Sequence, residues 1–160
     1  MSSRESCTCA KCVACCERKP GWMKPGEAEK IATFLNISVE ELFRDYLNVD
    51  WWERGDDPIF VLSPGIGGEE PGTEFPFVAK GRCVFLKDGL CSIHAVKPFE
   101  CGEAWCADGP VDRSESAHKK VADAWDAPEH QAQITTLLGR TPKTDDPDGF
   151  SLFDMLLGGL

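Results

Sequence analysis

Histidine, basic clusters and long apolar runs are all scarce in this sequence, and each shortage excludes a class of function. Seventeen Lys and Arg residues stand against twenty-seven Asp and Glu, giving a net charge of -10, and no basic run interleaved with aromatics interrupts that acidity. Such a chain repels phosphate, so we expect no nucleic-acid partner. No eighteen consecutive apolar residues occur, and thiols follow Arg4 and Glu5 where a signal peptide needs an apolar run. We therefore expect a cytoplasmic protein with no membrane partner.

Cysteine, by contrast, is abundant, with nine residues in 160. Four form the pattern C-x-x-C-x-x-C-C near the N-terminus, and four more follow in one block after a long cysteine-free stretch. In a reducing cytoplasm, thiols at this spacing are metal ligands more often than disulfides. The odd total leaves one spare thiol, for which Cys7 is the candidate because it lies outside the spacing. The predicted metal ligands are Cys9, Cys12, Cys15, Cys16, Cys83, Cys91, Cys101 and Cys106.

The donor set restricts the metal, since thiolates select zinc, copper(I) or iron-sulfur clusters over calcium and magnesium. Two closed sites of four thiolates suit structural zinc, while the same thiolates could hold a 4Fe-4S cluster and one zinc, or a larger cluster. With only three histidines in the chain, the excess of thiolates favours an iron-sulfur cluster, and zinc is the alternative. Adjacent Cys15 and Cys16 cannot face the same way. Their segment therefore wraps one metal as a non-helical knuckle or is shared by two metals.

The fold is predicted to be mostly α with a small β-hairpin (α+β), in one domain, 1–160, organised around a cysteine-ligated metal centre. The metal-binding region spans 7–106, C-terminal helices span 111–140 and a tail spans 141–160. Gly and Pro make 55–81 a long loop, extended only at Ile59–Leu62 and Phe75–Ala79. Helical spacing and capping residues predict four helices. The first runs from Pro25 to near Asn36 with Phe34 on its apolar face, and the second runs from Ser38 through Leu47, with Trp51 and Trp52 extending its apolar face. The third runs from Ser114 or Ser116 to Trp125, and the fourth from a cap at Asp126 to Gly139.

The hairpin between Arg82 and His94 has two possible registers with different chemistry. A three-residue loop, 87–89, places Cys83 and Cys91 on one face, which suits shared metal binding. A two-residue loop, 88–89, pairs Cys83 with His94 and sends Cys91 to the opposite side. His94 is thus a metal ligand, a partner to a sulfur atom or a plain hairpin residue.

Other titratable side chains offer no recognisable catalytic pattern. His118 and His130 stand among charged neighbours on predicted helices, so we expect both to face solvent. Glu100, Glu103 and Asp108 flank the thiols without a histidine or serine at a nucleophilic spacing, so no acid-base catalyst is predicted.

Four motifs together resemble a known family. C-x-x-C-x-x-C-C at Cys9–Cys16, G-R-C-V-F-L at Gly81–Leu86, C-S-I-H at Cys91–His94 and K-P-F-E-C at Lys97–Cys101 are similar to YkgJ-type cysteine-cluster proteins, described as zinc- or iron-chelating domains. The resemblance implies metal binding through all the predicted ligands except Cys106, which rests on its spacing alone. His94 stands where many relatives have Tyr, and Gly102 stands where Arg often follows the cysteine.

Three functions fit this resemblance and the donor set. The first is a redox or electron-transfer accessory with an iron-sulfur centre and a protein partner. The second is a zinc-stapled protein-interaction module. The third is a cluster-dependent enzyme resembling flagellin lysine N-methylase, a weaker expectation because the chain has no evident glycine-rich S-adenosylmethionine-binding domain.

Overall fold

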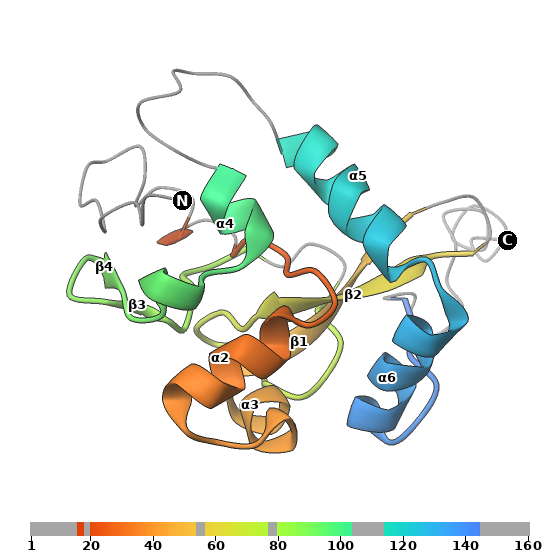
Figure 1. Cartoon of the computed structure of the whole chain (residues 1–160), viewed down its shortest axis with the longest axis horizontal. Helices are drawn as coiled ribbons and strands as arrows, with labels where there is room; N and C mark the ends of the chain where they lie inside the picture. The colour runs from red at the N-terminus through yellow and green to blue at the C-terminus, as the bar shows by residue number, and fades with distance from the viewer. Residues whose placement is uncertain (1–15, 18–19, 54–56, 77–79, 104–113, 145–160) are drawn as a thin grey trace, which may run out of the picture.

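A computed structural model describes residues 16–17, 20–53, 57–76, 80–103 and 114–144. These ranges hold five α-helices and two antiparallel hairpins, which confirms the predicted α+β class (Figure 1). In chain order the elements are α2 (Glu27–Leu35), α3 (Val39–Tyr46), β1 (Leu47–Trp52), β2 (Ile59–Pro64), β3 (Leu86–Lys87), β4 (Leu90–Cys91), the 3-10 helix η1 (His94–Val96), α4 (Phe99–Glu103), α5 (Ser114–Trp125) and α6 (Pro128–Leu138).

The first two helices form where their capping residues predict them. Helix α2 ends at Asn36, whose φ of 57° lies in the left-handed region and lets its N–H bond the last turn. Helix α3 begins after Ser38, whose side chain accepts a hydrogen bond from the Glu41 N–H at 3.1 Å. The prediction for Phe34 was wrong, since this residue is 50% exposed and only its neighbours along α2 reach the core.

A second hairpin, β1–β2, replaces the predicted continuation of α3 through Leu47 and the two tryptophans. The strands pair in register from Leu47 opposite Pro64 to Trp52 opposite Ile59. Strand β1 is buried along almost its whole length, including the polar side chain of Asn48, which donates to the Glu70 carbonyl at 2.7 Å. β-Branched and aromatic residues favour such a doubly covered strand. The extended segment predicted at Ile59–Leu62 is confirmed as the first part of β2.

Part of the long loop predicted at 55–81 pairs with strand β1. Besides β2, it supplies the neighbour of β1 on the outer edge, where the Val49 N–H donates to the Thr73 carbonyl at 3.0 Å and the Phe75 N–H donates to the Val49 carbonyl at 2.8 Å. Phe75 is 1% exposed and packs with Ile66 in a small separate core. Of the segment predicted to be extended at Phe75–Ala79, residues 77–79 lie outside the described residues.

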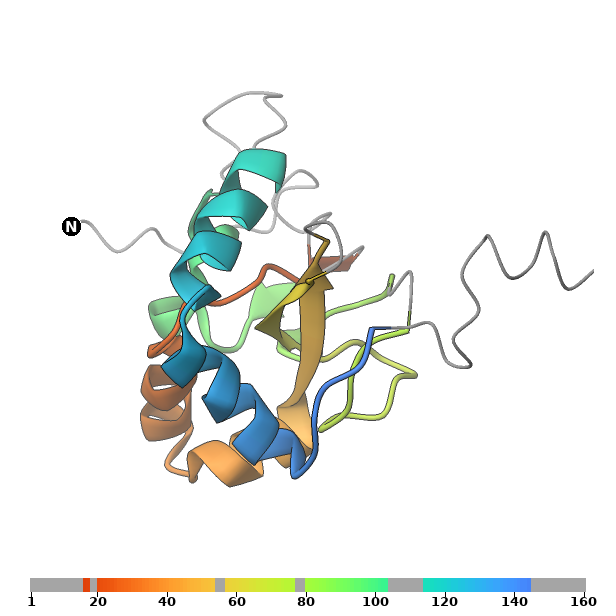
Figure 2. The same cartoon turned by 90° about the vertical axis from the view of Figure 1, so that its right-hand side faces the viewer.

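The main core lies between the β1–β2 hairpin and the helices. Figure 2 shows α2, α5 and α6 on one side of this hairpin and the loop that follows β2 on the other. The fully buried side chains include Met23, Ile31, Leu42, Leu47, Val49, Val61, Leu62, Val121, Trp125 and Ile134. Gln131 of α6 protects the free edge of β2, because its amide accepts from the Phe60 N–H at 3.1 Å and donates to the Phe60 carbonyl at 2.9 Å.

The last two helices follow the prediction with one correction. Helix α6 is capped by Ala127 rather than by Asp126, with no side-chain bond at its start. It ends at Gly139, whose φ of 74° is the left-handed conformation that glycine adopts without strain. No helix in the described part of the chain is long and apolar enough to cross a membrane.

Candidate metal centre

The β3–β4 hairpin takes the two-residue loop of the two predicted registers. Asp88 and Gly89 both have positive φ, at 52° and 75°, and Leu86 pairs with Cys91. The pairing does not continue to Cys83, because the chain turns where the Leu86 N–H donates to the Cys83 carbonyl at 3.1 Å. Cys83 instead bridges to Ile66. The expected pairing of Cys83 with His94 was therefore wrong, although the loop length was one of the two predicted.

The turn at Cys83 brings the two cysteine blocks together. The Cys83 N–H donates to the Cys16 carbonyl at 2.7 Å, across a separation of more than sixty residues. The Cys83 residue is 8% exposed, and Cys16, Cys91 and Cys101 are half-buried. Burial, and then the neighbouring thiols of Cys16 and Cys91, raise the pKa of Cys83 to about 12.

Cys101 and Cys91 complete the group of four. Burial raises the pKa of Cys101 well above its ordinary value, and the thiols of Cys83, Cys16 and Cys91 add to the shift. Burial also raises the pKa of Cys91, while the Lys97 ammonium partly lowers it. We call Cys16, Cys83, Cys91 and Cys101 the thiol cluster. Three of its members are therefore protonated at neutral pH unless a cation stabilises their thiolates.

Backbone N–H groups point at three of these sulfur atoms. Cys83 accepts bonds from the N–H groups of Phe85 and Leu86, and Cys91 accepts one from Ile93. Cys101 accepts one from Gly21. Each bond favours the thiolate and lowers the thiol pKa, but burial outweighs it. Amide donors around sulfur are also what stabilises a thiolate bound to a metal.

The thiol cluster fits a soft metal in its donor chemistry. Sulfur donors favour zinc or iron, either as a structural ion or as an electron-carrying cluster. Within the described ranges, no three His, Cys, Asp or Glu side chains lie close enough together to hold one ion. The other predicted ligands, Cys9, Cys12, Cys15 and Cys106, lie outside the described residues, as do Cys7 and Asp108.

Helix α4, which carries Cys101, is fixed to the N-terminal segment through Glu27. The Glu27 carboxylate accepts from the Phe99 N–H at 3.1 Å and from the Lys24 N–H at 2.5 Å. Burial raises the pKa of Glu27, and these two N–H bonds partly offset the shift. The Lys24 ammonium lies 3.9 Å from the centre of the Phe99 ring, a cation-π contact.

Gly21 allows the N-terminal segment to approach Cys101 closely. A Cβ atom at this position would lie 2.8 Å from both the sulfur and the backbone nitrogen of Cys101. Any other residue would displace one of the two segments. The sequence alone marks this glycine only as the end of the first cysteine segment.

His118 does not face solvent as predicted. Its side chain is 22% exposed, and its Nδ1 lies 2.5 Å from Oε2 of the buried Glu100. The other carboxylate oxygen of Glu100 accepts from the Trp22 N–H at 2.8 Å, and the His118 ring lies 4.0 Å from the Trp22 ring. Glu100 thus has a histidine partner, although the two residues are eighteen positions apart and stand at no recognisable nucleophilic spacing. His118, Val121, Ala122 and Trp125 share helical spacing, which could have placed this histidine on the buried face of α5.

The other two histidines differ from expectation in smaller ways. His94 lies in η1 rather than in β4, and burial together with Lys97 lowers its pKa. His130 is half-buried, and the centre of its ring lies 6.0 Å from the centre of the Trp125 ring in an edge-on arrangement.

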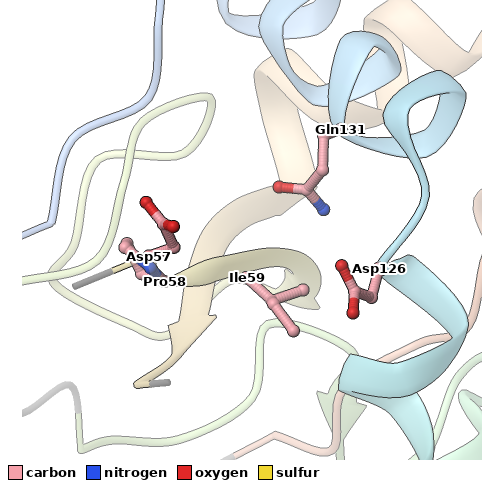
Figure 3. Close-up of a pocket in the computed structure, with 5 residues that line it drawn as sticks. All are labelled: Asp57, Pro58, Ile59, Asp126 and Gln131. Atoms are coloured by element: carbon pink, nitrogen blue, oxygen red, sulfur yellow. The ribbon is translucent and has the colours of Figure 1, made fainter. Parts of the chain in front are cut away.

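A shallow pocket elsewhere on the molecule has a structural explanation. Figure 3 shows it lined by Asp57, Pro58, Ile59, Asp126 and Gln131. The Gln131 amide is already bonded to Phe60 and to the Trp125 carbonyl. No thiol of the cluster lines this pocket. It is a depression where α6 meets β2.

Comparison with known proteins gives one match. Residues 8–125 match the family model CxxCxxCC, described as "Putative zinc- or iron-chelating domain". No curated protein and no solved structure matches the chain. The matched range includes both cysteine blocks, the thiol cluster and helix α5. The resemblance drawn from the four motifs is confirmed, and the chain belongs to the CxxCxxCC family, whose described activity is the chelation of zinc or iron.

Proposed function

We propose that this protein holds an iron-sulfur centre on its cysteine thiolates and acts in the cytoplasm as a redox or electron-transfer accessory to a protein partner. The observation that carries the proposal is the thiol cluster, which draws members from both cysteine blocks. The Cys83 N–H is bonded to the Cys16 carbonyl, and the sulfur atoms of Cys83 and Cys101 accept backbone N–H bonds. Soft sulfur donors without competing carboxylates suit iron-sulfur chemistry. The net charge of -10 favours a protein partner over nucleic acid.

The position of the thiols supports electron exchange. Cys83 belongs to the main core, whereas Cys16 and Cys91 are only partly buried at its edge. A cluster bound there would have protein on one side and lie near the surface on the other. Solvent exposure and hydrogen bonds to sulfur are two of the factors that set the potential of such clusters. The N–H groups of Gly21, Phe85 and Ile93 are placed to supply the second factor.

A zinc-stapled interaction module is the second candidate, and the shortness of the local elements favours it. Strands β3 and β4 have two residues each, and α4 has five. Elements this short are not stable alone. A zinc ion bound by thiolates from all these segments would hold them together without redox chemistry.

Metal analysis of protein purified without oxygen separates the two candidates. The proposal predicts iron and acid-labile sulfide in comparable amounts, a visible absorption band that bleaches on reduction, and loss of colour in air. Stoichiometric zinc with neither iron nor sulfide would overturn the redox proposal and favour the stapled module. The Cys101→Ser variant should lose most of the metal under the same conditions, whereas Cys7→Ser should retain it.

A further inference from the structure

We propose that His118 is a positioning residue for the metal centre. Through Glu100 it holds the turn of α4 that carries Cys101. The inference rests on the proposed metal centre at the thiol cluster, but it requires neither iron nor zinc in particular. None of the four motifs includes His118, and it lies on a separate helix, α5.

Glu100 is the link between the two helices. It is only 7% exposed, and a carboxylate is stable in such a place only when its oxygens are bonded. Oε1 accepts from the Trp22 N–H at 2.8 Å, and Oε2 lies 2.5 Å from Nδ1 of His118. Removing the His118 partner leaves one buried oxygen without its hydrogen bond. Moving Glu100 toward water then lowers the free energy of the local structure, because water can bond the unpaired oxygen.

A movement of Glu100 reaches Cys101 by two routes. The two residues are adjacent in α4, which is too short to resist displacement by its own hydrogen bonds. Glu100 also donates its N–H to the Trp22 carbonyl at 3.3 Å, so it is tied to Trp22 by two bonds. Gly21 precedes Trp22 and lies against the Cys101 sulfur. Displacing this pair therefore shifts both the sulfur and the N–H group that bonds it.

His118 is a suitable anchor because α5 belongs to the rigid half of the molecule. Val121, Ala122 and Trp125 of the same helix are at most 1% exposed in the main core. The His118 ring packs on Trp22, whose Nε1 donates to Asp50 of β1 at 2.8 Å. Figure 1 shows α4 beside the start of α5. The bond between Glu100 and His118 thus connects the core to a metal-binding turn.

Two substitutions separate the hydrogen bond of His118 from its ring. His118→Phe keeps an aromatic ring on Trp22 but cannot donate to Glu100. His118→Asn loses the ring but can place an amide N–H near the position of Nδ1. His130→Phe is the matched control, since His130 also lies beside a tryptophan but on α6. Circular dichroism and thermal unfolding of the metal-free variants check that each one folds.

The probe is Co(II), added to metal-free protein under anaerobic conditions. Its thiolate charge-transfer band reports sulfur ligation, and competition with a chelator gives the dissociation constant. We expect His118→Phe to weaken Co(II) binding about 10- to 100-fold, the range typical for residues that orient metal ligands, and to change the charge-transfer band. His118→Asn should recover most of the affinity. His130→Phe should match the native protein.

Each outcome decides between the proposal and its rivals. Native affinity and spectrum in a folded His118→Phe variant would overturn the positioning role and leave the metal centre intact. Equal losses in the Phe and Asn variants would overturn it as well, because a hydrogen-bond donor restored at this position would then fail to restore metal binding. Failure of the native protein to show a thiolate band with Co(II) would instead contradict the proposed metal centre itself.

A second measurement on the native protein keeps the proposal testable if His118→Phe does not fold. Binding energies between two coupled groups are reciprocal, so a metal that gains from the bond between His118 and Glu100 must also strengthen it. The Nδ1 proton that His118 donates to Glu100 gives a downfield NMR signal when it is protected from water. Adding Cd(II) should slow the exchange of this proton with water. An exchange rate unchanged by the metal would refute the coupling.

Discussion

The molecule has two regions that are stabilised in different ways. In the core region, formed by α2, α3, β1, β2, α5 and α6, side chains such as Val49, Leu62 and Ile134 are fully buried. In the cysteine region, formed by Cys16 and residues 80–103, the strands have two residues each and α4 has five. Apolar burial supplies the first region with a non-directional driving force. The second contributes Phe85, Leu86 and Ile93 to the main core but otherwise depends on individual bonds to Glu27 and Glu100. We therefore expect it to depend on a metal more than the core region does.

Removing the metal should have the largest effect on this contrast. Structural zinc contributes on the order of 10 kcal/mol to the folding of small zinc domains. Chelation should therefore abolish the amide-exchange protection of residues 80–103, while β1, β2 and α5 keep theirs. Hydrogen exchange with mass spectrometry measures both regions in one experiment. Equal loss of protection in both regions would show that the core also depends on the metal.

Truncating a side chain of the core region should lower stability whether or not metal is bound. Leu62→Ala removes a fully buried side chain from β2 and should lower the free energy of unfolding by about 2–5 kcal/mol. The loss should be the same with and without metal, as measured by urea unfolding. Phe34→Ala is the control, because Phe34 is 50% exposed and should change stability by less than about 0.5 kcal/mol. A Leu62→Ala effect that depended on metal would show that the two regions are not stabilised independently.

Two glycines next to the thiol cluster should respond differently to alanine. Gly21→Ala places a methyl group 2.8 Å from the Cys101 sulfur and should cost about 1–3 kcal/mol by overpacking, with weaker metal binding. Gly102→Ala meets no atom nearer than the Lys97 Cε at 3.9 Å and lies within α4, where alanine is favoured by up to about 1 kcal/mol. Unfolding and Co(II) titration of both variants measure the difference. Similar losses in the two would contradict the close approach of Gly21.

The smallest effect expected near neutral pH comes from the thiols themselves. The pKa of Cys83 rises from an ordinary value of 9.0 to about 12 on folding, and the pKa values of Cys91 and Cys101 also rise. A folded pKa above the unfolded one stabilises the protein fully below pH 9.0 and progressively less as pH rises toward 12. The metal-free protein should therefore lose thermal stability between pH 9 and 11. Cys83→Ala should reduce this slope, and an unchanged slope would exclude Cys83 as its source.

The affinity for metal should also depend on pH but in the opposite direction, increasing as pH rises. Thiols with a raised pKa are protonated at pH 7, and each must lose its proton to become a ligand. Calorimetry in buffers of different ionisation enthalpy should record about one proton released per thiolate ligand. Binding without proton release would mean that the thiols of Cys83 and Cys101 are not ligands.

The two regions also differ in how much of them the sequence predicts. Local signals fix helix boundaries, as at Ser38 with Glu41 and at Gly139, because capping acts within one turn. Strand β1 was missed since Leu47 and Trp51 continue the helical spacing of α3 and also fit an alternating pattern. Only the pairing with β2, which is not local, decides between the two patterns.

In the candidate site, too, local spacing is predictable from the sequence and contacts between distant segments are not. Regular spacing predicts the cysteines as ligands. The thiols of Cys83, Cys16 and Cys91 lie near enough to Cys101 to raise its pKa, and ligation by the four stays a prediction. The contacts that place them are not encoded in any spacing. Glu100 and His118 are eighteen residues apart on separate helices, and Gly21 meets Cys101 across eighty residues. Such contacts arise from the packing of α4 and α5, which a pattern in one segment does not contain.

X-ray absorption at the edge of the bound metal tests the central claim most directly, since it reports which atoms surround the metal. If the thiol cluster binds the metal, we expect a first shell of sulfur at about 2.3 Å, the distance typical of metal-thiolate bonds, and loss of sulfur neighbours in Cys83→Ser and Cys101→Ser. A first shell of nitrogen or oxygen at about 2.0–2.1 Å, unchanged by these substitutions, would contradict it.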